Sequence, residues 1–487
     1  ILEELIRATH RAGGSTSELP SSVLGMVQAR LDALDGQARV VLRAGAVFGT
    51  TFWGSAVADL TGGAERADVA QAALEQALAA EFVRVEPTSR FEGETAYSFC
   101  TGTVREAAYA MLTDSDRSTG HHLAATWLTE RGERDARLIA EHLERGGDLE
   151  AAAHQWLVAA AEALDANDIT NALTDAGRGV ATGVTGEVLG RLLVIEAEAA
   201  EWKGDAARAE ASARRAVDVL PAGEKSWYAA LANLTLASCR AGWTDEASAR
   251  VAEMLDSTPV DDDARSRKVV ALCRGALNAM WTGRYDLALQ QGLAAEQAEL
   301  VLDGAWPLAR ARLKHAEAYW YLHRGETGTA VGLFTEAEQA WAQAGDERSL
   351  TGVRTNLGFV YGQLGRFSDA EAKLREQMSR AELLGLTPLY HVCRHNLASV
   401  LAQRGDADAA IAMKEPAVAR LSRAGNPRLD GNVIASLGHV LYQVGRPEEA
   451  LVKADGAAAM LRPFAPTHAY ALAVAAAPAG AGPPAVG

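Results

Sequence analysis

Three stretches of the chain share one pattern: NLGFVYGQLGR at Asn356–Arg366, NLASVLAQRGD at Asn396–Asp406 and SLGHVLYQVGR at Ser436–Arg446. The stretches are evenly spaced, and one more equal step from Gly358 toward the N-terminus reaches Ala318, with Gly325 at the matching place. Self-similarity at a fixed period is the signature of a repeat architecture, in which each unit is one supersecondary element. The three stretches therefore predict a helical-repeat fold.

A glycine followed five residues later by an alanine marks each repeat. The glycine suits the left-handed backbone position that ends a first helix, and the alanine suits the place where the second helix is crossed closely. Because the gap between Gly147 and Gly204 is too wide for one unit, Asn167 and Ala172 are predicted to fill it, with the helix near 149–163 shared by two neighbouring pairs. About nine two-helix units are therefore expected, forming an all-α solenoid. The eight pairs are Gly147/Ala152, Gly204/Ala209, Gly242/Ala247, Gly283/Ala288, Gly325/Ala330, Gly365/Ala370, Gly405/Ala410 and Gly445/Ala450.

This pattern resembles the tetratricopeptide repeat (TPR), a helix–turn–helix unit with small residues at its eighth, twentieth and twenty-seventh positions. The resemblance covers residues 136–462, and the spacing of about 40 residues predicts helices longer than those of the usual repeat of about 34 residues. The small positions are Ala318, Gly358, Ala398 and Gly438; then Ala330, Ala370, Ala410 and Ala450; then Ala337, Ala417 and Ala457, with Met378 as the departure.

The resemblance implies a right-handed superhelix whose long inner groove is lined by the first helix of each pair. Aromatic side chains mixed with amides, histidines and an arginine suit an extended peptide or a partner helix. The alternative for any one of these residues is that it only packs between repeats. By repeat register, the predicted groove residues are Arg312, His315, Tyr319, Thr355, Phe359, Gln363, His395, Ser399, Gln403, Asn432, His439 and Gln443.

Residues 1–135 follow a different pattern. Leu19-Pro20-Ser21-Ser22 predicts a helix start, and further helices are expected near 35–46, 52–60 and 69–79. Two short strands, at 81–86 and 95–100, would form a wing, so residues 19–135 are interpreted as a winged-helix domain with connecting helices. The expected helices at 51–60 and 67–79 contain no basic residue, and the chain of 487 residues carries a net charge of −16. Neither nucleic acid nor an anionic membrane is therefore an expected partner.

The N-terminal third has a second resemblance, carried by four stretches. Ile1–Thr9 looks like the last lid helix of an AAA-type NTPase, and Leu19–Gly49, Val104–Leu112 and His121–Ala124 look like the winged-helix segment that follows it. Together they resemble the C-terminal part of a signal-transducing (STAND) NTPase, in particular bacterial proteins with a serine/threonine kinase before the NTPase and TPRs after it. The family usually has Phe-Arg-His where this chain has Phe99-Cys100-Thr101.

Motifs for nucleotide chemistry are missing from the sequence. It has no G-x-x-x-x-G-K-[ST] loop, no G-x-G-x-x-G kinase loop and no H-R-D or D-F-G segment. Residues 1–18 read as the end of a lid helix and a linker, so the chain is interpreted as a fragment. The resemblance implies that ATP and magnesium bind upstream of Ile1, with that NTPase as a partner in cis. This chain itself is expected to be non-enzymatic and without cofactor.

Other candidate sites give weaker signals. His391 and His395 lie four residues apart on one helix face, but no third metal ligand is identifiable nearby. Cys100, Cys239, Cys273 and Cys393 lie far apart, which favours reduced thiols in a cytoplasmic protein. Residues 463–487, rich in Ala, Pro and Gly, are expected to be a disordered or truncated tail.

Two function classes stay open besides the leading hypothesis, which is a protein-interaction and regulatory module of a signalling ATPase. The second is the partner-sensing part of an ATP-dependent transcriptional regulator whose DNA-binding domain lies outside this chain. The third, a stand-alone enzyme, has little support because no catalytic motif is found.

Overall fold

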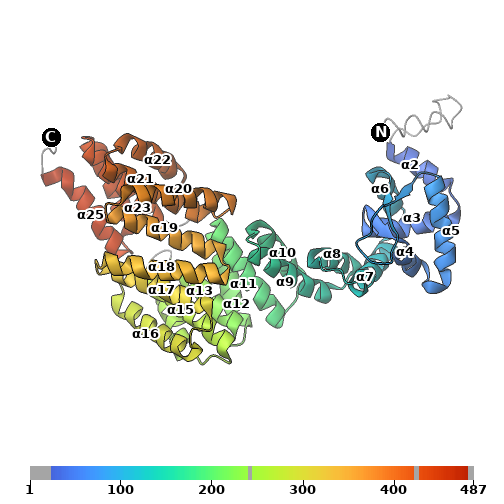
Figure 1. Cartoon of the computed structure of the whole chain (residues 1–487), viewed down its shortest axis with the longest axis horizontal. Coiled ribbons are helices and arrows are strands. Elements are labelled where there is room, and N and C mark those ends of the chain that lie inside the picture. The colour runs from blue at the N-terminus through green and yellow to red at the C-terminus, as the bar shows by residue number, and fades with distance from the viewer. Residues whose placement is uncertain (1–22, 240–243, 422–426, 481–487) are drawn as a thin grey trace. The chain divides into compact units, whose positions relative to one another are not determined.

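The computed structural model describes residues 23–239, 244–421 and 427–480 (Figure 1). The chain divides into two compact units, residues 1–159 with 181–184, and residues 160–180 with 185–487. The lid helix predicted at Ile1–Thr9, the linker and the helix start at 19–22 lie outside the described residues.

Helices surround a small sheet in the first unit. Strands β1 (Thr51–Trp53), β2 (Val83–Val85) and β3 (Ala96–Phe99) pair antiparallel in the order β1-β3-β2. The helices are α2 (Val23–Asp32), α3 (Gly36–Phe48), α4 (Gly54–Thr61), α5 (Ala67–Ala79), α6 (Gly102–Ala110), α7 (Asp114–Glu130) and α8 (Ala136–Gly146), with a 3-10 turn η1 (Ala64–Arg66) before α5.

Strand β1 of this sheet differs from the sequence-based prediction. A helix was expected to begin near Phe52, but Thr51–Trp53 form β1 and the helix begins at Gly54. Phe52 lies opposite Tyr97 of β3, and the two rings stack with their centroids 5.8 Å apart. A β-branched residue followed by two aromatics favours a half-buried strand, and here that preference prevails. The two strands expected at 81–86 and 95–100 are present, whereas the winged-helix assignment itself stays a prediction.

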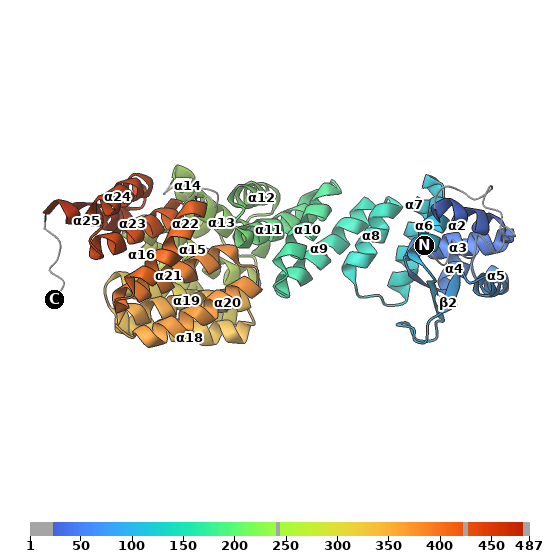
Figure 2. The same ribbon diagram turned by 90° about the horizontal axis from the view of Figure 1, so that it is seen from above.

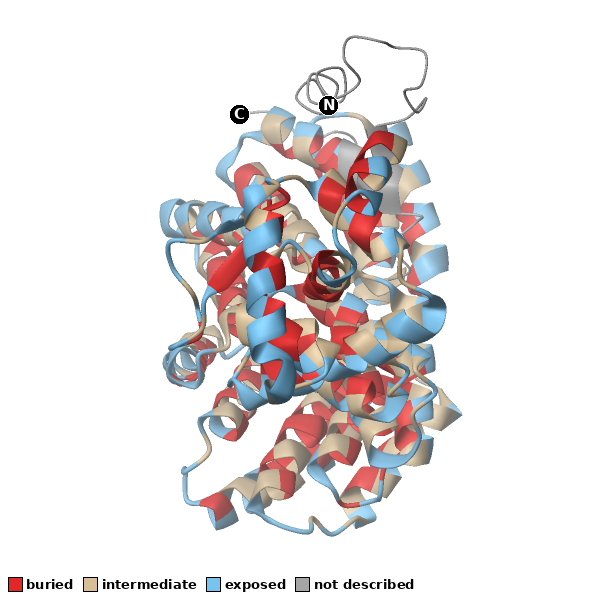
Figure 3. Ribbon diagram, turned by 90° about the vertical axis from the view of Figure 1, so that its right-hand side faces the viewer, coloured by how far each residue is buried: buried red, intermediate tan, exposed pale blue. Residues whose placement is uncertain are grey.

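Antiparallel helix pairs build the rest of the chain, which confirms the all-α helical-repeat prediction for this part. Figure 2 shows α18 to α21 side by side, and each of these helices contacts the next. Many of the helices alternate buried and exposed residues (Figure 3), as expected when neighbouring pairs cover one another, whereas α13 and α15 have no exposed residue beyond their first turn. The helices are α9 (Leu149–Asp165), α10 (Ile169–Ala181), α11 (Gly186–Lys203), α12 (Ala206–Val219), α13 (Lys225–Ser238), α14 (Asp245–Asp256), α15 (Asp262–Trp281), α16 (Tyr285–Leu302), α17 (Pro307–His323), α18 (Thr327–Ala344), α19 (Glu347–Gln363), α20 (Phe367–Leu383), α21 (Thr387–Arg404), α22 (Ala407–Leu421), α23 (Pro427–Gln443), α24 (Pro447–Leu461) and α25 (Ala465–Gly480).

The glycine and alanine pattern has the structural meaning that the sequence predicted. Of the eight glycines, all but Gly242, which lies outside the described residues, have positive φ. Asn167 also takes the left-handed conformation, with φ of 63°, and so ends α9 as expected. All nine paired alanines, Ala172 included, are buried. At Gly358 an added Cβ would lie only 2.8 Å from Leu374 Cγ, so the small residue there is a steric requirement.

Within the second unit, the solenoid closes on itself, because helices far apart in the sequence come into contact. Helix α21 contacts α11, and α25 contacts α15. The Arg348 guanidinium donates from Nη1 to the carbonyl oxygen of Leu164 over 2.6 Å, and Ala381 and Leu386 pack against Ala199 in one buried cluster. The inner face is therefore enclosed along part of its length, rather than open as a long groove.

The expected disordered tail is helical over most of its length. Helix α25 begins at Ala465, with Pro466 in its first turn, and its alanine-rich sequence has high helix propensity. Phe464 and Ala471 are buried against Leu461 and Ala457, so this helix is held by packing. The disorder prediction is thus wrong for residues 465–480, because apolar residues at spacings that suit one helix face outweigh the prolines and glycines near them.

Candidate functional site

The predicted groove residues fall into rows, because positions one repeat apart occupy the same place on α17, α19, α21 and α23. His315, Thr355 and His395 form a deep row, followed by a middle row of Tyr319, Phe359, Ser399 and His439 and an outer row of Gln363, Gln403 and Gln443. Arg312 and Asn432, one helical turn earlier on α17 and α23, are both half-buried. Exposure increases from the deep row to the outer row.

The deep row packs between repeats. Thr355 is 0% exposed, and its hydroxyl lies 3.2 Å from Cys393 Sγ. His315 is buried, and its Nε2 lies 2.9 Å from the side-chain nitrogen of Asn356. Burial lowers the pKa of His315 to about 3, so its ring is neutral at physiological pH. His395 is half-buried, and burial also lowers its pKa well below the usual range. These neutral, packed side chains join neighbouring repeats.

The middle row consists of three half-buried side chains and one exposed side chain. The Tyr319 hydroxyl donates to Asn356 Oδ1 over 2.9 Å, and its ring stacks on His315 at a centroid distance of 5.5 Å. Phe359 is half-buried, and Ser399 donates its hydroxyl to a backbone carbonyl one turn earlier over 3.0 Å. His439 is exposed. The aromatic rings are therefore fixed by hydrogen bonds and packing, and part of each stays accessible.

Accessible polar groups are concentrated in the outer row. Gln363 and Gln443 end α19 and α23, Gln403 is the last residue but one of α21, and all three are exposed. His323 occupies the same position at the end of α17 and is also exposed, although it was not among the predicted groove residues. The repeat register predicts this position, because His323 lies one repeat before Gln363 in the sequence. We call His323, Gln363, Gln403 and Gln443 the amide row, since it presents one donor or acceptor side chain per repeat.

A charged chamber of about 250 Å³ lies on the inner side of the second unit, between first helices from α11 to α21. Both signs of charge meet there: Arg267, Arg274 and Arg312 with Glu198, Glu201 and Asp346. Only Arg312 of these was predicted, because the others lie on helices outside the clearest repeat register or away from its groove positions. The remaining lining residues are Trp202, Leu236, Val270, Leu277, Asn278, Trp281, Leu308, Ser349 and Pro388.

Aromatic rings hold the guanidinium groups at this chamber. The Arg312 guanidinium lies 4.7 Å from the ring centroid of Trp341, and Arg428, beside the chamber, lies 4.1 Å from that of Trp281. Arg312 also donates to the Ser349 hydroxyl over 3.4 Å. Burial lowers the pKa of Arg312 to about 10, so it still carries its charge at neutral pH. The chamber thus offers fixed cations on aromatic faces.

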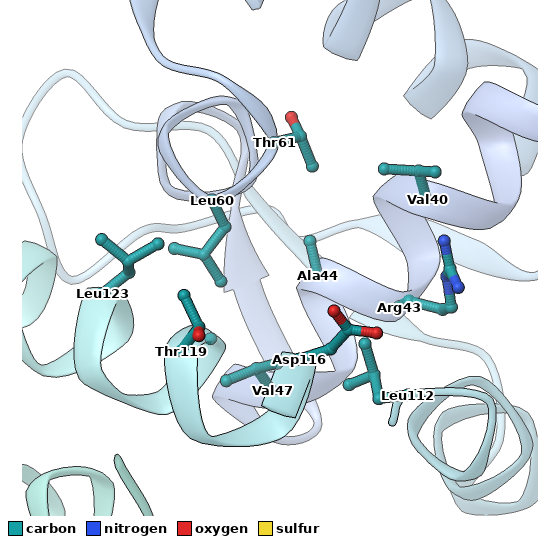
Figure 4. A pocket seen from close by; sticks show the side chains of 11 residues that line it. Val40, Arg43, Ala44, Val47, Leu60, Thr61, Leu112, Asp116, Thr119 and Leu123 are labelled. Atoms are coloured by element: carbon teal, nitrogen blue, oxygen red, sulfur yellow. The ribbon is translucent and has the colours of Figure 1, made fainter. Parts of the chain in front are cut away.

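A smaller hollow of about 230 Å³ lies in the first unit between α3, α4 and α7 (Figure 4). Arg43 and Asp116 line it together with apolar side chains such as Leu60 and Leu123. The Asp116 carboxylate already accepts a hydrogen bond from the backbone of Thr113 and so caps α7. The hollow is therefore a weaker candidate than the inner side of the array.

The other predicted features concern metals, thiols and membranes. Within the described ranges, no group of three or more His, Cys, Asp or Glu side chains is placed to hold a metal ion. Burial raises the pKa of Cys239 and Cys273 to about 12 and that of Cys393 to about 11, which makes these thiols unreactive. No helix in the described part of the chain is long and apolar enough to cross a lipid bilayer.

Comparisons with known proteins find similarity of structure only. No protein-family model matches the sequence, and no curated protein matches it. One similar solved structure is a signal transduction ATPase with numerous domains (STAND) with a tetratricopeptide repeat sensor from Pyrococcus horikoshii, at 13% identity and a TM-score of 0.39 over 98% of this chain. This chain spans 66% of that protein, just under two thirds of its length.

Two further structures are similar to this chain. The first is a Rap protein complexed with Competence and Sporulation Factor, at 12% identity and a TM-score of 0.43, covering 57% of this chain and 77% of that one. The second is the APC/C hetero-tetramer Cut9–Hcn1, at 13% identity and a TM-score of 0.44, covering 76% of this chain and 78% of that one. The likeness concerns the helical fold alone.

Proposed function

We propose that the chain is a protein-interaction module whose second unit binds an extended segment of a partner along the amide row. Packed helices lie about 8–10 Å apart, and an extended chain rises about 3.3 Å per residue. A side chain repeated once per helix pair therefore meets every third residue or so of an extended peptide. Gln363, Gln403 and Gln443 can each donate and accept one backbone hydrogen bond of such a peptide.

The middle row and the chamber support the same proposal. Phe359 and Tyr319 give apolar contact beside the amides, and their positions are fixed before any ligand arrives, which lowers the entropic cost of binding. At the chamber, Arg274 and Arg312 can bind a carboxylate, and Glu198 and Glu201 can bind an amine. The amide row carries the proposal, because it is the part of the predicted groove that is exposed.

A triple variant tests this function: Gln363→Ala, Gln403→Ala and Gln443→Ala in the whole chain. A library of random peptides displayed on phage would be selected on the wild type, and retention of the enriched peptides measured on each protein. The matched control changes Gln290, Gln339 and Gln343 to alanine, since these exposed glutamines lie on the second helices α16 and α18. We expect retention to fall at least tenfold in the triple variant and to be unchanged in the control. Equal retention by both, or no enrichment on the wild type, would refute the proposal.

The parent protein is proposed to be a bacterial STAND ATPase acting in the cytoplasm, with a serine/threonine kinase before the NTPase. The resemblance of Leu19–Gly49 and Val104–Leu112 supports this, and the first unit would pass partner binding to the NTPase as a winged-helix domain. ATP and magnesium would bind upstream, while this chain alone would hydrolyse no nucleotide. A P-loop upstream of Ile1 in the reading frame is expected, and its absence would count against the ATPase. A helix-turn-helix beyond Gly487 would favour the transcriptional regulator instead.

A further inference from the structure

Among the second helices from α14 to α22, α16 alone lacks a large buried side chain at one repeated position, where α12 and α24 have the alanines Ala213 and Ala454. Four residues after the repeated alanine stand Val251 in α14, Phe334 in α18 and Leu374 in α20, each almost completely buried. Helix α16 has Gly292 at this place, and a Cβ added there would meet nothing within 4 Å. A hollow of about 420 Å³ opens here between α15, α16, α17 and α18. Glycine in a helix interior costs about 0.5–1 kcal/mol relative to alanine, and packing does not require it here.

Apolar side chains line this hollow and extend beyond it. Leu313 and Trp320 of α17 form its floor, and Leu289 and Leu293 of α16 form one wall while remaining 45% and 49% exposed. The apolar stripe continues along the exposed side of α16 to Leu300, which is 74% exposed. The hollow and this stripe together are called the α16 groove below. Exposed apolar patches of this kind mark interaction sites.

The rim of the α16 groove is acidic. Glu296 and Glu317 line it, and Glu336 stands beside it on α18. Lys314 is the single cation among the lining residues, and its Nζ lies 2.8 Å from Glu317 and 3.9 Å from Glu336. The surplus of carboxylates favours a basic partner and opposes a second copy of this chain, whose net charge is −16.

We propose that the α16 groove binds an amphipathic helix of a partner protein, which inserts a large apolar side chain over Gly292 and places lysines or arginines beside Glu296 and Glu336. The inserted side chain would fill the space that Phe334 and Leu374 fill in the following repeats. Tyr285, which is 43% exposed and lies one turn before Leu289, begins the stripe, so from Tyr285 to Leu300 it spans about 15 residues, which is about 22 Å at about 1.5 Å per residue. This length suits a helix of about four turns rather than a small molecule.

The test uses two fluorescein-labelled synthetic peptides and fluorescence anisotropy with the whole chain. Both peptides carry leucine and one tryptophan at helical spacing, and they differ only in having lysine or glutamate at the remaining positions. We expect the lysine peptide to bind saturably and the glutamate peptide at least tenfold more weakly. Raising the salt concentration should weaken binding of the lysine peptide.

Three variants test where the lysine peptide binds. If one of them fails to fold, the other two still test the proposal. Gly292→Phe should raise the melting temperature, because it fills the hollow, and should weaken binding of the lysine peptide at least tenfold. The exposed double variant Leu289→Gln with Leu293→Gln should also lose binding, and Glu296→Gln with Glu336→Gln should abolish the preference for lysine over glutamate. Leu383→Gln on α20, where the leucine is 76% exposed, is the matched control and should bind as the wild type does.

Several results would overturn the proposal. Unchanged binding by Gly292→Phe and by the double leucine variant would place the peptide elsewhere. Absence of saturable binding to the wild type, or equal binding of both peptides, would refute the chemistry of the partner. A dimer in sedimentation that Leu293→Gln dissociates would show that a second copy covers the groove. The α16 groove and the amide row share no residue, so failure of one proposal leaves the other standing.

Discussion

Replacement of a single buried lysine should stabilise this protein in a pH-dependent way. Lys414 of α22 is 1% exposed, and its Nζ lies 3.2 Å from His395 Nδ1 and 3.1 Å from Ser399 Oγ. Among the described residues, no carboxylate pairs with it. Burial lowers its pKa from 10.5 to about 7. We predict that Lys414→Met raises stability at neutral pH, since methionine keeps the apolar stem without the amine.

The magnitude follows from proton linkage. Between pH 7 and pH 10.5 the unfolded chain binds a proton at Lys414 that the folded chain does not, so stability rises with pH through this window. The drop from 10.5 to about 7 corresponds to about 5 kcal/mol at pH 7, at about 1.36 kcal/mol per pH unit. Methionine also loses three hydrogen bonds, to His395 Nδ1, the His395 carbonyl and Ser399 Oγ, each contributing about 1 kcal/mol. The expected net gain is therefore about 1–2 kcal/mol at pH 7, and it should vanish at about pH 8.3.

Calorimetric melting of wild type and variant at pH 7, 8.5 and 10 measures this difference. Groups other than Lys414 titrate in both proteins, so the comparison at equal pH isolates the one amine. Lys453→Met on α24, where the lysine is half-buried, serves as the matched control and should show no such trend. A variant that is less stable than the wild type at pH 7, or a difference that does not change with pH, would refute the reasoning.

Two further perturbations follow from the packing of the array. Gly358→Ala should destabilise by about 1–3 kcal/mol, because its Cβ would lie 2.8 Å from Leu374 Cγ, whereas Gly332→Ala, with open space around it in α18, should stabilise by about 0.5–1 kcal/mol. Opposite shifts of the melting temperature are expected, and shifts of the same sign would contradict the packing described. Arg348→Met should remove one of the two hydrogen bonds that the carbonyl of Leu164 accepts, the other coming from the backbone N–H of Asn167, at a cost of about 1–3 kcal/mol. Hydrogen exchange should then quicken at 160–172 and 381–390, and a uniform change over the second unit would argue against a local contact.

Much of the array was predictable because its pattern is local. A glycine that ends a helix and an alanine at a helix crossing act within one hairpin, so Gly147 and Asn167 could be assigned from the sequence alone. The closure of the solenoid was not predictable in this way. It depends on small rotations between repeats that accumulate over successive helix pairs, until Leu164 meets Arg348.

The candidate site was likewise predictable in part, for its local features but not for its long-range contacts. Register predicts Thr355 and Gln363 on one helix, and both lie on α19, but their burial depends on which side chains of the neighbouring repeat pack against them. Cys393 of α21 covers Thr355, while Gln363 at the helix end stays exposed. The charged chamber was missed for a similar reason, since Glu198 and Asp346 come together only because the solenoid closes.

At one position of the repeat, two residues that depart from the usual large apolar side chain have different structural consequences. Four residues after the alanine, where Phe334 and Leu374 fill the space between helices, α16 has Gly292 and α22 has Lys414. Both departures cost stability, and sites that break a local rule are where function is expected. Lys414 is sealed at 1% exposure, so no partner reaches it and its effect is confined to the pH dependence of stability. Gly292 instead leaves an apolar hollow that opens at the surface, so a partner side chain can recover the lost packing. Between Gly292 and Lys414, only the glycine can therefore serve binding.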